Sequence, residues 1–202
     1  MKCIKLIGIL SLLFIFSGCF PQPHVVKVEN PKLRIKQQGY SLIPTNETGW
    51  IIPARSSYQL ALARKDNTES DETFAIQATL FNLPHFSNDQ ELLEIVKQGQ
   101  KADTNPLRFT FIKNETINYM YQNISCVKSH ASVIDKKAEK KSNSIGNMIL
   151  EAKTLVCPHP ENKRVGVSIT YSQRYYKSQQ TPGFMDKSDS VINSVKFEEL
   201  NI

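Results

Sequence analysis

Two cysteines, Cys126 and Cys157, constrain the fold more than any other feature of the chain. Each lies in a segment where apolar and polar residues alternate (125–136 and 147–157), and the charged run 137–146 separates the two segments. Alternation of this kind predicts half-buried β-strands. When these strands pair antiparallel about the charged run, Cys126 falls opposite Cys157, where a disulfide can form. The sequence therefore predicts a β-hairpin closed by a disulfide.

The same register assigns the other residues of the hairpin to two faces. One face is small and mostly apolar, and consists of Val127, Ser129, Ala131, Val133, Leu150, Ala152, Thr154 and Val156. The opposite face is predicted to be more exposed to solvent, and it carries Lys128, His130, Ser132, Glu151 and Lys153. A slip of one residue would separate the sulfur atoms and mix the two faces, so the cysteines and the alternation support one register.

The rest of the chain predicts further strands and two helices. The expected strands are 50–53, 58–65, 73–82, 108–119 and 165–174. The sequence Ser-Asn-Asp-Gln at 87–90 predicts a helix that begins with a capping box and ends near 101–104, and a second helix is expected from Gly183. Helices that interrupt runs of antiparallel strands indicate an α+β fold. We therefore expect a mainly antiparallel β-sheet packed by two or more helices, with one cross-strand disulfide.

The N-terminus has the pattern of an export signal. Lys2 and Lys5 precede an apolar run, 6–16, that is too short to span a bilayer as a helix. The sequence Phe16-Ser17-Gly18-Cys19 then resembles the lipobox of bacterial lipoproteins. The resemblance implies cleavage before Cys19 and attachment of acyl chains there. Because Phe20 stands where an aspartate would imply retention in the inner membrane, it also implies an outer-membrane location.

These features divide the chain into three parts. We expect a lipoprotein signal peptide at 1–18, a lipid-anchored tether at 19–38 and a periplasmic α+β domain at 39–202. The number of cysteines is consistent with an exported domain that contains one disulfide. With Cys3 in the leader and Cys19 lipidated, the two remaining cysteines form one pair, as a structural disulfide requires.

Four short stretches of the domain together resemble a group of Gram-negative lipoproteins: 58–62, 81–84, 157–160 and 171–174. The order of strands and helices is also similar to the α–β–α sandwich of the PsbP and Mog1 type. Members of that class bind other proteins, so the resemblance implies a binding role.

Motifs that carry catalysis or bind metals are weak in this sequence. His159 lies two residues after Cys157, but a zinc site needs three or four ligands and a disulfide-bonded cysteine supplies no thiolate. Ser125 and Lys128 match the Ser-x-x-Lys motif of penicillin-recognising enzymes, but the companion motifs are missing. We therefore expect no metal, no cofactor and no enzymatic activity.

The formal charge of +6 does not indicate a nucleic-acid-binding protein. Its basic residues are scattered, apart from Lys136, Lys137, Lys140 and Lys141 at the tip of the predicted hairpin. A nucleic-acid-binding face would need stacking aromatic residues or a recognised motif as well. We expect a solvated loop at this tip and no nucleic-acid partner.

The best candidate for a binding patch is Tyr171, Arg174, Tyr175 and Tyr176, because tyrosine and arginine are enriched at interface hot spots. The expected function is a membrane-anchored, non-enzymatic binding or accessory subunit of a periplasmic or outer-membrane protein assembly. One alternative is a carrier of a lipid or small apolar ligand, which needs an apolar cavity of roughly several hundred Å³. Another is a hydrolase, which needs a paired nucleophile and base in a cleft.

Overall fold

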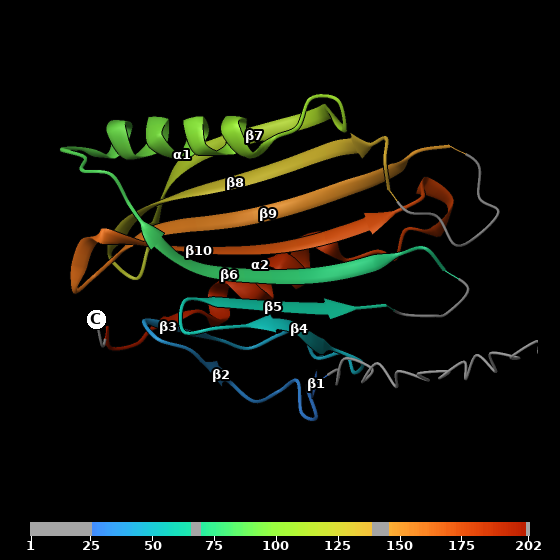
Figure 1. Cartoon of the computed structure of the whole chain (residues 1–202), viewed down its shortest axis with the longest axis horizontal. Helices are drawn as coiled ribbons and strands as arrows, with labels where there is room; N and C mark the ends of the chain where they lie inside the picture. Colours follow the sequence, from blue (N-terminus) through green and yellow to red (C-terminus); the bar gives the residue numbers. More distant parts are fainter. Residues whose placement is uncertain (1–25, 66–69, 139–145, 201–202) are drawn as a thin grey trace, which may run out of the picture.

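The computed structural model describes residues 26–65, 70–138 and 146–200. Within these ranges one antiparallel sheet of eight strands dominates the fold (Figure 1). In spatial order its strands are β1 (Val26–Lys27), β4 (Ile51–Arg55), β5 (Gln59–Arg64), β6 (Thr73–Asn82), β10 (Asn162–Tyr175), β9 (Met148–His159), β8 (Ile124–Asp135) and β7 (Phe109–Tyr121). Helices pack on both faces, so the predicted α+β fold is confirmed.

Both helices begin close to the predicted positions, although the first is capped by Asn88 and not by Ser87, where the predicted capping box began. Helix α1 (Asp89–Asp103) is capped by Asn88, whose side chain accepts a hydrogen bond from the amide of Glu91. The Glu91 carboxylate accepts one in return from the amide of Ser87, which extends the cap by one residue. Helix α2 (Phe184–Ser194) follows Gly183, whose φ of 91° favours glycine. A short 3₁₀ turn, η1 (Lys177–Gln179), precedes it.

A second, three-stranded sheet was not predicted from the sequence. It consists of β11 (Lys196–Phe197), β3 (Tyr40–Leu42) and β2 (Ile35–Lys36). Strands β1 and β2 both fall in the segment 19–38 assigned to the tether, and β1 pairs with β4 at the edge of the main sheet. Packed structure therefore extends into that segment. The predicted signal peptide and Cys19 lie outside the described residues.

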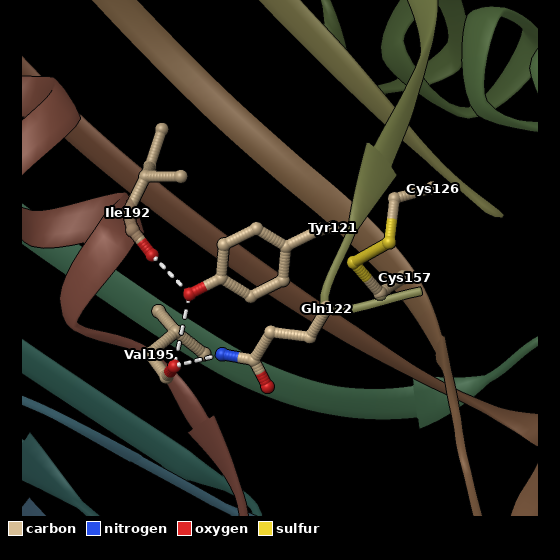
Figure 2. The surroundings of a disulfide bond; sticks show 6 residues. All are labelled: Tyr121, Gln122, Cys126, Cys157, Ile192 and Val195. Carbon is tan, nitrogen blue, oxygen red and sulfur yellow. Dashed lines mark hydrogen bonds between the residues drawn. A yellow bond between two sulfur atoms is a disulfide. The ribbon is translucent and has the colours of Figure 1, made fainter. Parts of the chain in front are cut away.

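The β8–β9 hairpin has the predicted register. Val127 pairs with Val156, Ala131 with Ala152, and Val133 with Leu150. The disulfide joins Cys126 to Cys157 across a Cα–Cα distance of 4.4 Å, close to the spacing of a non-hydrogen-bonded antiparallel pair (Figure 2). The register and the disulfide are both confirmed.

The larger hydrophobic core lies between the sheet and α2, on the hairpin face that was predicted to be more exposed to solvent. Both cysteines are buried there, together with Tyr40, Trp50 and Ile169. This prediction was wrong because α2 and the small sheet cover the face and its polar side chains find partners. Lys153 is 4% exposed and is paired with Asp189 of α2, and His130 stacks on Phe184.

The small, mostly apolar face of the hairpin points the other way, toward α1. A second, smaller core forms where α1 meets this face, and consists of Leu83, Leu92, Leu93, Val96, Val127 and Val156. Helix α1 contacts β7 and β8 and leaves much of the sheet face beside it uncovered (Figure 1). The candidate site lies under this helix.

Candidate functional site: an apolar groove under helix α1

A groove of about 1010 Å³ runs between α1 and the sheet. Its wall comes from the C-terminal half of α1 and its floor from β8, β9 and β10, with the ends of β6 and β7 beside them. The larger apolar side chains that line it are Phe81, Leu83, Ile95, Val96, Phe109, Phe111, Val133, Leu150 and Val156. A concave, mostly apolar space of this size is typical of sites for small molecules or acyl chains.

The groove exists because small residues lie on both sides of it. On the floor, Ala131 and Ala152 are directly paired across β8 and β9. On the wall, Gly99 and Ala102 line the same space, and a Cβ placed on Gly99 would meet no atom within 4 Å. Close packing of a helix on a sheet requires side chains that fill the space between their backbones. Here these side chains are too short to fill it.

The polar atoms of the floor bond mainly to one another. Gln100 of α1 donates to the hydroxyl of Ser129 at 2.8 Å and accepts from the hydroxyl of Thr116 at 3.1 Å. The hydroxyls of Thr154 and Thr170 lie 2.8 Å apart and share a hydrogen bond. Because these groups are satisfied within the protein, the floor presents chiefly methyl and methylene groups to a ligand.

The two ends of the groove differ in chemistry. At one end, Leu83, Val96 and Val156 belong to the core under α1, which closes the space. At the other end the last lining residues are Phe109, Val133 and Leu150. Beyond them, on the same face of the sheet, lies a charged cluster of Arg108, Asp135 and Arg174.

The cluster is held together by Asp135, which is 1% exposed. Arg108 donates to its carboxylate from Nε and from Nη2, both at 2.8 Å, and the guanidinium also lies over the ring of Phe109 at the mouth of the groove. The Nε of Arg174 lies 3.3 Å from the same carboxylate. Two guanidiniums therefore share one carboxylate, which leaves one net positive charge.

The pKa of each charged group reflects this crowding. Burial raises the pKa of Asp135, but the hydrogen bonds from Arg108 and the charge of Arg174 outweigh it, so the pKa lies below its ordinary value. For Arg174, burial lowers the pKa, Asp135 raises it and Arg108 lowers it, and the net shift is downward. Arginine nevertheless stays charged at neutral pH.

The predicted patch on β10 is not an exposed aromatic surface. Tyr171, Tyr175 and Tyr176 are buried, the first completely. Burial raises the pKa of Tyr175 to about 12, helped by the nearby Glu151 carboxylate that its hydroxyl contacts. Only Arg174, whose side chain is 31% exposed, remains accessible. The structure thus separates the four residues and places Arg174 beside the groove.

A histidine–carboxylate pair lies on the opposite face of the sheet. His130 Nε2 is 2.8 Å from Glu151 Oε1, and its ring stacks on Phe184. Among the described residues no hydroxyl or thiol is hydrogen-bonded to His130. His159 is fully buried and contacts the carbonyls of Gly39 and Glu198, which holds the C-terminal segment against β3. No group of metal-ligating side chains occurs in the described parts of the chain.

Of the basic cluster predicted at the hairpin tip, Lys136 and Lys137 are exposed and directly follow Asp135. The amide of Lys136 donates to the carbonyl of Arg108, which brings this loop next to the charged cluster. Lys140 and Lys141 lie outside the described residues.

Sequence reasoning missed both the groove and the charged cluster. A signal for the groove was present, because the hairpin face with Ala131 and Ala152 has side chains too small to fill the space below a helix. No comparable signal existed for the cluster, since Arg108 precedes β7, Asp135 ends β8 and Arg174 lies in β10. No protein-family model matches the chain, and no curated protein matches it either. In the ranges that the structure describes, no helix has the length and hydropathy needed to cross a bilayer.

Proposed function

We propose that this chain is a membrane-anchored envelope lipoprotein that binds an apolar ligand, an aliphatic chain, in the groove under α1, without catalysing a reaction. The observation that carries the proposal is the groove itself. Its volume of about 1010 Å³ exceeds what a small apolar ligand needs, and its satisfied polar atoms leave a mostly apolar lining.

The length of the floor also suits an acyl chain. From Val156 to Leu150 the groove follows β9 for about 20 Å, at roughly 3.3 Å per residue. One leaflet of a bilayer contributes about 15 Å to a hydrocarbon core of about 30 Å. An acyl chain of the length found in membrane lipids therefore fits along the floor.

Strand β1 is the described strand nearest in sequence to Cys19. This strand lies at one edge of the sheet, and β9 is five strands away, or about 24 Å at roughly 4.8 Å per step. A domain tethered through Cys19 can thus hold its groove away from the attachment point. This arrangement supports a periplasmic role, with the groove open to molecules beyond the membrane surface.

A neutral fluorescent probe, N-phenyl-1-naphthylamine, tests the proposal. We expect the purified domain to bind the probe with saturation and 1-dodecanol to displace it. Ala152→Phe, which fills the floor, should abolish binding. Ala54→Phe is the matched control, because it adds the same side chain to exposed β4, far from the groove. Absence of saturable binding, or equal binding by both variants, would refute an aliphatic-chain site in this groove.

A second candidate function is that of an accessory subunit for an envelope protein. It is favoured by strand β7, which forms an edge of the sheet and exposes Phe111, Ile112, Ile117 and Met120. Exposed apolar side chains gathered on one edge strand are typical of a protein contact. Crosslinking in intact envelopes tests this alternative. Loss of a specific crosslinked product in Ile117→Lys, but not in the control Leu33→Lys, would support it, and an unchanged product would contradict it.

A further inference from the structure

We propose that the ligand is an anionic amphiphile, whose aliphatic chain lies in the groove and whose negatively charged headgroup binds Arg108 and Arg174 at the open end. This inference rests on the proposed function and adds the chemical class of the ligand. The shared chemistry is a carboxylate or phosphate on a long chain, as in a fatty acid or a phospholipid.

The charged cluster is placed where a headgroup would emerge. Val133 lines the groove and Asp135 is the next residue of β8 on the same face. On β10, Ser168 and Thr170 line the groove, and Arg174 lies farther along the same face, paired with Leu150 at the end of the floor. The guanidinium of Arg108 covers the ring of Phe109, another lining residue. The ends of β8 and β10 and the turn before β7 thus bring the cluster to the mouth of one groove.

The cluster also has hydrogen-bond donors that are not used within the described part of the protein. Arg108 uses Nε and Nη2 for Asp135, and its Nη1 makes no hydrogen bond with any described residue. The side chain of Arg174 contacts Asp135 as an ion pair and makes no hydrogen bond with any residue that the structure describes. Guanidiniums with unused donors and partial exposure bind carboxylate and phosphate oxygens well, because their planar fork matches both groups.

The surrounding charges favour an anion as well. Burial and the positive charge of Arg108 both lower the pKa of Arg174, so a second anion beside the pair would relieve the repulsion. Lys136 and Lys137 follow Asp135 and are exposed. The acidic residue among the described lining is Asp103, at the end of α1, where its side chain is exposed and solvent screens its charge.

The two ends of the groove together fix the orientation of the ligand. The end beneath α1 is closed by Leu83, Val96 and Val156 and offers no charged partner among the described residues. A headgroup buried there would lose its hydration without compensation, which is costly for an ion. The methyl end of the chain therefore lies under α1, and the headgroup lies at Arg108 and Arg174, which remain accessible to water.

Displacement of N-phenyl-1-naphthylamine by four dodecyl compounds tests the inference. We expect dodecanoate and dodecyl phosphate to displace the probe at concentrations roughly tenfold to a hundredfold lower than 1-dodecanol, because only the anions can accept charge-assisted hydrogen bonds from the guanidiniums. Dodecyltrimethylammonium should bind no better than the alcohol. A preference for only one of the two anions would assign the headgroup to that source. Equal displacement by the alcohol and both anions would overturn the inference.

Arg174→Gln tests the proposed headgroup site separately from the apolar groove. The variant should lose at least about tenfold of its affinity for the anions and keep its affinity for 1-dodecanol. Arg108 still holds Asp135 in this variant, and the melting temperature checks that the fold is retained. Arg164→Gln is the matched control, because Arg164 is an exposed arginine at the other end of β10. A preference for anions that survives Arg174→Gln would contradict the proposed headgroup site.

Two further measurements keep the result unambiguous. Arg174→Lys retains the charge and should keep part of the preference for anions. In the wild-type protein, raising the salt concentration should narrow the difference between dodecanoate and 1-dodecanol, because ions screen a partly exposed cluster. If the probe and 1-dodecanol do not bind at all, the proposed function fails. If they bind and the anions gain nothing, only the headgroup site fails.

Discussion

The guanidinium of Arg108 donates two parallel hydrogen bonds to the carboxylate of Asp135, each 2.8 Å long, although 27 positions separate the two residues in sequence. Arg108 precedes β7, whereas Asp135 ends β8, so the pair closes the open end of the β7–β8 hairpin. Bidentate pairs of this geometry are stronger than ordinary hydrogen bonds and fix the orientation of both groups. The same pair positions a guanidinium at the mouth of the groove, which links the stability of the hairpin to the candidate site.

Asp135→Asn is expected to lower the free energy of unfolding by about 2–3 kcal/mol at pH 7, because it removes the shared partner of two guanidiniums. The pKa of Asp135 is lowered in the folded state, so its contribution is present above the ordinary carboxylate value of about 3.9. It is lost as the pH falls through the lower folded pKa. Urea unfolding between pH 7 and about pH 2 checks this dependence.

The difference between wild type and Asp135→Asn should therefore shrink as the solution is acidified. Glu199→Gln is the control, because Glu199 is exposed and makes no side-chain bond with a described residue. A difference that stays constant over the whole pH range would show that the ionised carboxylate is not what stabilises the fold.

Replacing Cys126 and Cys157 by serine together should cost about 3–4 kcal/mol of stability, since the disulfide closes a loop across a sequence separation of 31. Both sulfur atoms are buried, so the variant also places two hydroxyls in the core. Urea unfolding of the variant, compared with wild type with and without dithiothreitol, measures the effect. Free thiols at both positions in protein recovered from the periplasm would contradict the expectation.

The β8–β9 hairpin could be predicted from the sequence because two independent signals determined its register. The period of two residues placed Ala131 and Ala152 on one face, and the cysteines excluded a slip to the other face. Helix α1 could be predicted for a similar reason, since its cap is a local interaction, although the cap lies at Asn88, one residue after the predicted position. Both predictions depend on residues that are close in sequence or joined by a covalent bond.

The charged cluster could not be predicted because it depends on contacts between distant elements, and the groove needed such contacts besides the small side chains of Ala131 and Ala152. Strand β10 pairs with β6 as well as β9, and nothing local in either sequence specifies that pairing. The predicted binding patch on β10 was misassigned for the same reason, because the contacts that bury its tyrosines come from distant elements. Val167, Ile169 and Tyr171 alternate on one face, which already placed Tyr171 in a core, but the helix that covers this face comes later in the chain.

Tyr121→Phe should destabilise the protein by about 1 kcal/mol, which is typical of one buried hydrogen bond. The hydroxyl of Tyr121 lies 2.9 Å from the carbonyls of both Ile192 and Val195, at the end of α2 (Figure 2). Burial raises the pKa of this tyrosine, and it stays neutral and donates. Urea unfolding measures the loss. Tyr58→Phe is the control because Tyr58 is 59% exposed, and an equal effect of both substitutions would contradict the role of Tyr121.

The last prediction concerns the membrane anchor. Cys19→Ser should leave an unprocessed precursor that still carries residues 1–18, because the lipobox resemblance implies that lipid attachment precedes cleavage. Mass spectrometry of the wild-type protein from envelopes should find acyl chains at Cys19, and two or more chains are needed for a stable anchor. Fractionation of wild type and variant measures the loss of anchoring.

Cys3→Ser is the matched control, because Cys3 lies in the predicted leader and should be removed during processing. Processing of the precursor should therefore be unchanged in this variant. A mature wild-type protein whose N-terminus is unmodified and lies elsewhere would refute the anchor. The groove would be unaffected by that result, since β1 to β11 carry the domain without the anchor. Probe binding by the domain and lipid attachment at Cys19 can thus succeed or fail independently.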